Sequence, residues 1–508
     1  MKNIPTRTIA GYVQYALEYA LTVQKPDGTE ANYSKEMMKL YFQNEDPSFD
    51  LLFDTQDEGQ SYVDRYKADI LSDGSTVVAE RVNFTPQPQS SMSVIDQHTG
   101  YVKAIIGGRG QKTASLTLNR ATDSMRQPGS TFKIVSTYAP ALNELGMSLA
   151  TTYEDQPITY PNGAPVNNAS NSFSGTVTIR TAIRNSINTV AVQCLEDVTP
   201  ELGLKYLDNF GFTTLAHGTE ADTDANGNVY TDANLPTALG GLTYGVTNVE
   251  LCAAYAAIAN NGTYIKPVYY TKILDHNGNV LIENNSAGRS VIKESTAFLL
   301  TSAMEDVVQN GTGTACQLDN MAVAGKTGTT EDYNDLWFVG YTPYYTCAVW
   351  SGYDGNQKLP DDARNFHKNL WRKVMSRIHQ GMEYKDFDQP ASVEKVAVCA
   401  DSGLLPMDGC PVIEEYFDVG TIPTEYCELH YYEEYDEEEQ DMEISDQEQL
   451  DPNNPDGANT DNPNNPDNPD NPDNPDNRII RITRITRIMA AIQQVEAISP
   501  ITTDLCMV

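Results

Sequence analysis

The chain has 508 residues, 40% of them hydrophobic, and a formal net charge of −36 at pH 7. This length allows several domains, and the negative charge excludes a nucleic-acid-binding function because no basic surface is available to neutralise phosphates. The sequence has no apolar run long enough to span a bilayer and no hydrophobic signal-peptide core after Met1, so we expect neither feature in the chain as given.

The first 87 residues are predicted to form a polar, helical linker module. Apolar residues recur at helical spacing over residues 12–20 and 37–41, and residues 62–70 have the same character. We recognise no catalytic motif in this region. Residues 1–87 are therefore interpreted as a connecting module.

Residues 88–385 are predicted to form the main domain, with an α+β fold. Residues 92–96 and 101–108 are typical of two strands joined by a tight turn. Helices are expected over residues 130–145, 178–195, 248–260 and 291–308, and further strands over residues 321–328, 336–341 and 345–353. Because the helices lie between strands at both ends of the domain, an antiparallel sheet covered by helices is favoured over alternating βαβ units.

The sequence after residue 385 changes character. Residues 386–430 are expected to form a small C-terminal extension, and residues 431–477 an acidic linker without order. From residue 433 to residue 476 the chain contains 17 acidic residues and no Lys or Arg. Residues 451–477 repeat Asn-Pro-Asp, a pattern that blocks helix formation and offers almost nothing apolar to bury.

Residues 478–508 are basic and apolar at their start, unlike the repeat before them. Codons for Asn-Pro-Asp (AAY-CCG-GAT), read one base out of register, encode Ile or Thr, then Arg, then Ile, which matches the start of this tail. We therefore interpret residues 478–508 as a frameshifted continuation of the linker with no fold of its own.

The cysteines fall into two groups. Those in apolar sequence are expected to be buried thiols: Cys194, Cys252 and Cys347. Cys399, Cys410 and Cys427 lie close together in the extension, which is compatible with a disulfide if this region lies outside the cytoplasm. The sequence has no C-x-x-C pair, and the nearby histidines lack the ligand spacing that we sought, so we expect no metal site and no cofactor.

Ser130 and Lys133 form an S-x-x-K motif at the start of a predicted helix, after the turn of residues 127–129. Residues three apart share a helix face, so the amine can reach the hydroxyl and act as its base if burial or a nearby cation lowers the lysine pKa. The Ser130 amide can then help to bind an oxyanion. A serine at a helix start can also be a simple N-cap. A second S-x-x-K, Ser392 to Lys395, lacks the turn and the apolar helix face and is interpreted as chance.

Ser186 and Asn188 form an S-x-N motif within the predicted helix over residues 178–195. Polar residues at such positions often have no special role. In the functional interpretation Ser186 relays a proton to the leaving amine, and Asn188 orients Lys133 and the amide of the substrate.

Lys326 begins a K-T-G-T motif after an apolar strand. Lys326, Thr327 and Thr329 offer a charge and two hydroxyls that suit a carboxylate, and Gly328 leaves room for a ligand backbone at the strand edge. Lys326 is also the cation expected to lower the pKa of Lys133, and the Thr329 amide is a candidate second oxyanion donor. The simpler interpretation is a strand that ends in a polar turn.

In this order and context the three motifs resemble those of class A penicillin-binding proteins, within the serine acyltransferases that also include the serine β-lactamases. The resemblance covers residues 88–385 and extends to residues 96–100, 118–121 and 253–262. It implies an antiparallel sheet flanked by helices, with a mostly helical subdomain that carries Ser130 and Ser186. It also implies a D,D-transpeptidase that cross-links peptidoglycan stem peptides ending in D-Ala-D-Ala through an acyl-Ser130 intermediate, and that β-lactams acylate.

The resemblance also implies features that the chain as given lacks. Class A proteins carry an N-terminal membrane helix and a glycosyltransferase module, and residues 1–87 resemble the linker that follows such a module. The full-length protein is therefore expected at the extracytoplasmic face of the bacterial membrane, with the glycosyltransferase module or a cell-wall synthesis complex as partner. Two alternatives stay open: a β-lactamase or D,D-carboxypeptidase with water as acceptor, and a non-catalytic penicillin-binding sensor or inactive fragment.

Overall fold

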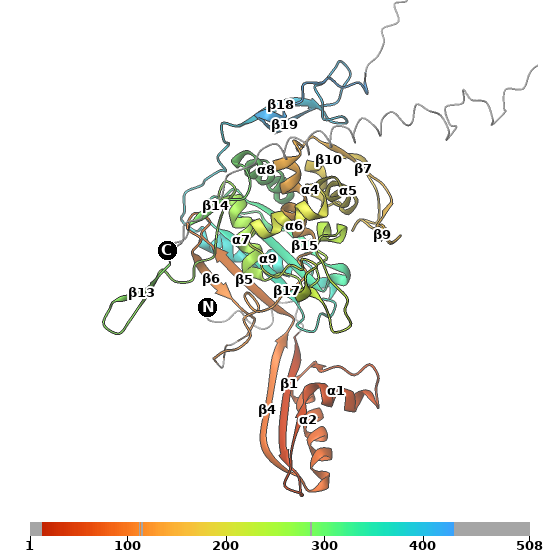
Figure 1. Ribbon diagram of the computed structural model, residues 1–508, viewed down its shortest axis with the longest axis vertical. Coiled ribbons are helices and arrows are strands. Elements are labelled where there is room, and N and C mark those ends of the chain that lie inside the picture. The colour runs from red at the N-terminus through yellow and green to blue at the C-terminus, as the bar shows by residue number, and fades with distance from the viewer. Residues whose placement is uncertain (1–12, 111, 113–114, 285–286, 431–508) are drawn as a thin grey trace, which may run out of the picture. The chain divides into compact units, whose positions relative to one another are not determined.

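The computed structural model of the chain describes residues 13–110, 112, 115–284 and 287–430 (Figure 1). These residues belong to one structural unit, Met1–Glu433. The predicted acidic linker, residues 431–477, and the predicted frameshifted tail, residues 478–508, lie outside the described residues. Within the described part of the chain, every helix is too short or too polar to cross a bilayer.

The N-terminal region is an α/β lobe, so the prediction of an entirely helical module is wrong. Its elements are β1 (Gln14–Gln24), β2 (Glu30–Ser34), α1 (Lys35–Gln43), β3 (Leu52–Phe53), α2 (Gln56–Ile70) and β4 (Thr76–Gln87). β1 pairs antiparallel with β2, β3 and β4, and both helices contact β1. The helices expected over residues 37–41 and 62–70 are confirmed, whereas residues 14–20 lie in a strand.

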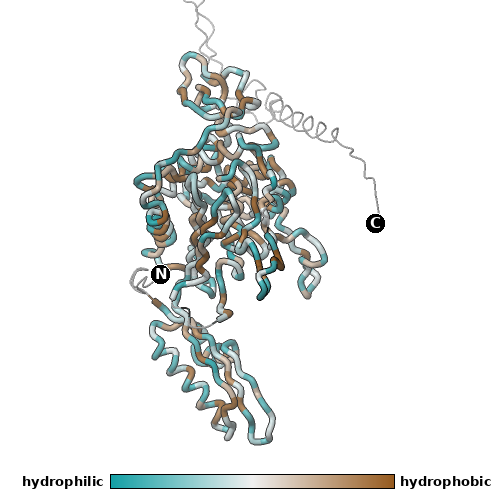
Figure 2. The backbone as a smooth tube through the Cα atoms, turned by 90° about the vertical axis from the view of Figure 1, so that its left-hand side faces the viewer, coloured by the Kyte–Doolittle hydropathy of each residue, from teal (hydrophilic) through white to brown (hydrophobic). Residues whose placement is uncertain are grey.

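Burial explains why this segment is a strand. Leu17, Tyr19, Leu21 and Val23 are buried, and the residues between them are more exposed. A spacing of two matches one face of a strand, and the long pairing with β4 satisfies the backbone of the segment. Figure 2 shows hydrophobic and hydrophilic segments interspersed along this lobe.

The main domain is built on a five-stranded antiparallel sheet in the order β15-β16-β17-β5-β6. Its strands and the helices that contact them are β5 (Gln89–Ile95), β6 (Val102–Ile106), α7 (Asn248–Ala259), α8 (Glu294–Asn310), β15 (Ala324–Thr329), β16 (Asp335–Tyr341), β17 (Thr346–Gly352) and α9 (Phe366–Ile378). Each strand and helix predicted for this part of the chain is confirmed, with boundaries that differ by a few residues.

Both faces of the sheet are covered by helices. Along β16, Trp337, Val339 and Tyr341 join one core with residues of α7 and α8. Phe338, which points to the opposite face, joins a second core with Trp371 of α9. This arrangement confirms the prediction of an α+β fold with an antiparallel sheet flanked by helices.

A mostly helical subdomain lies between β6 and α7 in the sequence. Its elements are η2 (Gly129–Thr131), η3 (Lys133–Tyr138), α3 (Ala139–Glu144), β7 (Thr152–Asp155), β8 (Ile158–Thr159), β9 (Pro165–Val166), β10 (Gly175–Thr178), α4 (Ile179–Asn185), α5 (Asn188–Val198) and α6 (Pro200–Asn209). The strands between α7 and α8 form two pairs, β11 (Thr263–Ile265) with β14 (Gly288–Ser290) and β12 (Lys272–Leu274) with β13 (Val280–Glu283).

The helix predicted over residues 130–145 is irregular. A 3-10 turn, η2, leads into a π-helix, η3, and only then into the α-helix α3. Pro140 has no amide hydrogen to donate to the carbonyl of Ser136, four residues earlier, so a regular α-helix would lack a hydrogen bond here. π-helical turns are frequent at functional sites, and this one begins with Lys133.

The C-terminal extension is a pair of antiparallel strands, β18 (Val393–Cys399) and β19 (Val412–Asp418). One link to the helical subdomain is an ion pair in which Arg180 of α4 donates two hydrogen bonds of 2.6 Å to the Glu415 carboxylate. The Asp418 carboxylate also accepts a hydrogen bond from Ser295 in α8.

Candidate active site

Ser130 lies where the helical subdomain meets the central sheet. It belongs to η2, which contacts both β15 and β16. Ser130 is half-buried, whereas the three residues that follow it are buried. The indole nitrogen of Trp337 in β16 donates a hydrogen bond of 2.9 Å to the Gln127 carbonyl, which fixes the turn before the serine. The serine is thus partly exposed on a well-anchored turn.

Three glycines allow the Ser130 turn to pack closely on its neighbours. A Cβ atom on Gly129 would lie 2.8 Å from the Thr329 carbonyl oxygen, and one on Gly240 would lie 2.3 Å from the Gly129 carbonyl oxygen. A Cβ atom on Gly328 would lie 2.5 Å from the carbonyl oxygen of the residue before Gly129. Gly129 also has a φ of 55°, which glycine adopts without strain. This packing brings the backbone segments of Ser130 and Thr329 side by side.

Lys133 is completely buried, and its amine points to the S-x-N motif. The Nζ atom donates hydrogen bonds to the Ser186 carbonyl oxygen at 2.7 Å, the Asn188 Oδ1 atom at 2.6 Å and the Ser186 Oγ atom at 3.3 Å. Burial holds the pKa of Lys133 well below its usual value, and the charge of Lys326 lowers that pKa further. Both causes were expected from the sequence.

Ser186 separates two helices that were predicted as one. It ends α4 in the left-handed region, with φ 58° and ψ 43°, and α5 begins two residues later. This conformation is uncommon for a residue other than glycine, and such strain is concentrated at functional sites. The turn places the Ser186 hydroxyl between two amines, 3.3 Å from Lys133 Nζ and 2.8 Å from Lys326 Nζ.

Lys326 is also completely buried, in the edge strand β15. Its Nζ atom donates to Ser186 Oγ at 2.8 Å and to the Thr327 carbonyl oxygen at 3.3 Å. Burial lowers the pKa of Lys326 to about 7. The Thr327 hydroxyl lies 2.7 Å from the hydroxyl of Thr312, and Thr329, at the end of the strand, is exposed.

Asn188 is held by residues that the sequence did not single out. The backbone amide of Asn188 donates a hydrogen bond to Asn168 Oδ1 at 2.9 Å, and its side-chain Nδ2 atom donates one to the Asn167 carbonyl oxygen at 2.6 Å. Asn168 in turn donates to the buried Asp155 carboxylate at 2.7 Å. These residues are far apart in the sequence and form no motif, so only the fold reveals them.

The other sequence interpretations can also be placed. Ser392 lies immediately before β18 and Lys395 lies within it, so the two residues do not share a helical turn as the motif requires. This agrees with the interpretation of the second S-x-x-K as chance. The three cysteines expected to be buried thiols are buried: Cys194, Cys252 and Cys347.

The family of the chain follows from a comparison with known proteins. The family described as penicillin binding protein transpeptidase domain matches residues 91–375, which include all three motifs. The chain belongs to this family. A second family, penicillin-binding protein 1A, C-terminal domain, matches residues 389–432.

Individual relatives agree with this assignment. Penicillin-binding protein 1A of Clostridium tetani is 34% identical over 362 residues, which cover 68% of this chain and 45% of the relative. Penicillin-binding protein 1A of Clostridium botulinum (strain Hall) is 35% identical over 361 residues, which cover 68% of this chain and 42% of the relative. The chain therefore spans less than half the length of these relatives.

Solved structures of low identity share the fold. The crystal structure of penicillin-binding protein 1A from Haemophilus influenzae has a TM-score of 0.57 at 20% identity. The match covers 80% of this chain and 64% of the Haemophilus chain. The PonA1 protein from Mycobacterium tuberculosis, solved in complex with penicillin V, has a TM-score of 0.52 at 24% identity. The match covers 65% of this chain and 85% of the PonA1 chain.

Proposed function

We propose that this chain is a peptidoglycan D,D-transpeptidase that is acylated by β-lactams. Its substrates would be stem peptides that end in D-Ala-D-Ala, and the acceptor would be an amine of a neighbouring stem. The observation that carries the proposal is the hydrogen-bonded chain from Lys133 through Ser186 to Lys326, next to the Ser130 turn. Membership of the transpeptidase family supports the same conclusion.

Ser130 would be the nucleophile and Lys133 its base. A lysine can accept a proton at neutral pH only if its pKa is lowered, and burial together with Lys326 lowers the pKa of Lys133. In acylation the Ser130 Oγ atom would bond to the carbonyl carbon, and the bond to the leaving amine would break. The proton would pass from Ser130 to Lys133 and then through Ser186 to that amine, while Asn188 orients Lys133 and the amide of the substrate.

The carboxylate of the ligand would be bound at β15. Lys326 is buried there, and the partners of its amine among the described residues are oxygens of Ser186 and Thr327 rather than a carboxylate. Thr327 and Thr329 add hydroxyls. β15 is an edge strand of the sheet, so a ligand backbone can lie against it near Gly328. The amides of Ser130 and Thr329 would bind the oxyanion.

Acylation by penicillin should depend on pH through the two lysines. The rate constant is expected to rise with pH as Lys133 loses its proton, and to fall as Lys326 loses the charge that binds the carboxylate. Since the Lys326 pKa is lowered to about 7, the falling part of the profile of the free enzyme should lie near pH 7.

Replacement of Lys326 by arginine tests this assignment, because a guanidinium keeps its charge throughout this range. In Lys326→Arg the falling part should move to much higher pH, even if the maximum rate is lower. A falling part that stays near neutral pH in Lys326→Arg would contradict the role of Lys326.

The lifetime of the acyl-enzyme formed with penicillin separates a transpeptidase from a β-lactamase. After a short incubation with fluorescent penicillin and removal of the free drug, the protein should keep its label for hours, because water is a poor acceptor in a transpeptidase. Loss of the label within seconds, with steady hydrolysis of the drug, would favour a β-lactamase. Absence of any label would favour an inactive fragment.

The setting of the full-length protein is also part of the proposal. The relatives named penicillin-binding protein 1A are more than twice as long as the part that matches this chain. We infer that the full-length protein acts at the extracytoplasmic face of the bacterial membrane, attached through a segment outside this chain. A glycosyltransferase module, or a cell-wall synthesis complex, would supply the glycan strands.

A further inference from the structure

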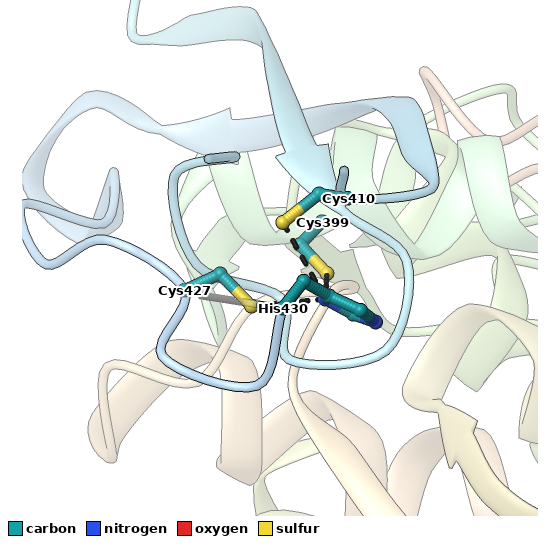
Figure 3. Close-up of side chains that lie close together, drawn as sticks. All are labelled: Cys399, Cys410, Cys427 and His430. Atoms are coloured by element: carbon teal, nitrogen blue, oxygen red, sulfur yellow. Dashed lines mark hydrogen bonds between the residues drawn. The ribbon is translucent and has the colours of Figure 1, made fainter. Parts of the chain in front are cut away.

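Four side chains in the C-terminal extension converge on one point (Figure 3). They are Cys399, Cys410, Cys427 and His430, whose sulfur and ring nitrogen atoms all lie within 4.8 Å of one another. The His430 Nδ1 atom lies 3.5 Å from the sulfurs of Cys399 and Cys410 and 3.4 Å from that of Cys427. The pair Cys427 and His430 has two residues between its members, a ligand spacing that a search for C-x-x-C pairs does not detect.

Hydrogen bonding alone does not explain this arrangement. A ring nitrogen carries either one proton or one lone pair, so His430 Nδ1 cannot form three hydrogen bonds at once. The other ring nitrogen, Nε2, lies 3.2 Å from the Asp401 carboxylate, which favours a proton on Nε2. The lone pair of Nδ1 then faces the three sulfurs. Histidines that bind a metal through one ring nitrogen typically donate the N–H of the other ring nitrogen to a carboxylate, as His430 does here.

We propose that these four residues bind a Zn²⁺ ion. Zinc in a site of three cysteines and one histidine is tetrahedral, with Zn–S distances of about 2.3 Å and Zn–N distances of about 2.0–2.1 Å. Such a tetrahedron places each sulfur about 3.5 Å from the nitrogen. The three distances from sulfur to nitrogen, 3.5, 3.5 and 3.4 Å, match this value. Three thiolates and an imidazole are also the ligands that zinc prefers.

The backbone holds the ligands in place before any metal is considered. Cys399 is the last residue of β18, and its amide donates to the Leu404 carbonyl at 2.8 Å. The Cys427 amide donates to the Leu405 carbonyl, also at 2.8 Å, which joins the two ligand-bearing segments. The Met407 amide donates to the sulfur of Cys410 at 3.3 Å. An amide that points at a sulfur stabilises the thiolate form that zinc requires.

A disulfide accounts for less of the geometry. A disulfide would join two of the three cysteines and leave the third thiol and His430 without a reason to converge. Its two sulfurs would be about 2.05 Å apart, whereas every cysteine in the described part of the chain is a free thiol. The zinc site uses all four side chains and Asp401.

The site would stabilise the extension rather than take part in catalysis. Its four protein ligands leave no open position, as in structural zinc sites. The core of the extension is small, with Val398 and Phe417 packed against Ala150 of the main domain. Segments with so little buried apolar surface commonly need a metal or a cross-link. None of the four ligands belongs to the proposed serine site, so this inference does not depend on the proposed function.

Metal analysis of the full chain tests the proposal. The chain purified under reducing, anaerobic conditions should contain about one Zn²⁺ per molecule by elemental mass spectrometry. After removal of zinc, added Co²⁺ should give the strong visible bands of tetrahedral cobalt and a near-ultraviolet band from thiolate to cobalt charge transfer. The variants Cys410→Ser and His430→Gln should lose most of the bound zinc and weaken these bands.

Matched substitutions control for a general loss of structure. Cys316→Ala removes a buried thiol and His276→Gln an exposed imidazole, both outside the cluster, and both variants should keep one zinc. Wild-type chain that holds no zinc and shows no thiolate–cobalt band would overturn the proposal. So would a disulfide between two of the three cysteines in protein isolated without oxidation. These measurements on the wild-type chain decide the question even if a variant fails to fold.

Discussion

Replacement of Ser130 by alanine is expected to abolish covalent labelling by fluorescent penicillin, lowering the acylation rate by about 10⁴-fold or more. The reason is that the acyl bond forms on the Ser130 Oγ atom, which alanine lacks. The change should not unfold the protein, because Ser130 is half-buried and the turn is held by Gln127 and the neighbouring glycines. Labelling is read from a denaturing gel, and folding from the thermal unfolding midpoint.

The second S-x-x-K motif provides the control for this experiment. Ser392→Ala should label like the wild-type chain, since Ser392 precedes strand β18 of the extension and is not among the motif residues that contact one another. If Ser130→Ala is folded and still labels at the wild-type rate, Ser130 is not the nucleophile.

Replacement of Lys133 by methionine is expected to lower the acylation rate by about 10²–10⁴-fold, the usual contribution of a general base. Methionine keeps most of the volume of the side chain but cannot accept a proton. The free energy of unfolding should change little, because the lost hydrogen bonds to Ser186 and Asn188 are offset by removal of a buried amine. The rate is measured by stopped-flow or timed labelling with penicillin.

Lys395→Met, in the second motif, is the matched control and should acylate normally. The two outcomes of the Lys133 experiment are distinct. A slow but folded Lys133→Met variant supports its role as the base, whereas a folded variant with the wild-type rate would show that another group deprotonates Ser130.

The main domain was predictable because its sequence signals are local and consistent. The apolar strands, the helices with apolar faces and the turn at residues 97–100 all appear where they were expected. The strand β1 of the N-terminal lobe was not predictable from the sequence, because its apolar residues fit a helical spacing as well as a strand spacing. Pairing with β4, more than fifty residues away in the sequence, decides between them.

The candidate site was predictable as a set of residues but not as a geometry. The motifs identified Lys133, Ser186 and Lys326, and the structure brings their side chains into one hydrogen-bonded chain. The left-handed turn at Ser186 could not be foreseen, since a serine inside a helical pattern gives no signal for it. The contacts from Asp155 and Asn168 depend on residues brought together only by folding.

The cysteines of the extension show the same limit. Cys399, Cys410 and Cys427 are spaced by loops whose path the sequence does not define, and the nearby histidines, which include His430, were set aside because they lack the ligand spacing that we sought. Hydrogen bonds between the Leu405 and Cys427 segments bring the four side chains together. The proposed zinc site therefore rests on the fold, whereas the serine site rests on motifs as well.

The central claim is that the acyl group is carried by Ser130, and peptide mapping tests it most directly. The chain is treated with penicillin, digested, and examined by tandem mass spectrometry. The account predicts one adduct with the mass of the drug, on the Ser130 side chain. An adduct on another residue, with Ser130 unmodified in a folded protein, would contradict it.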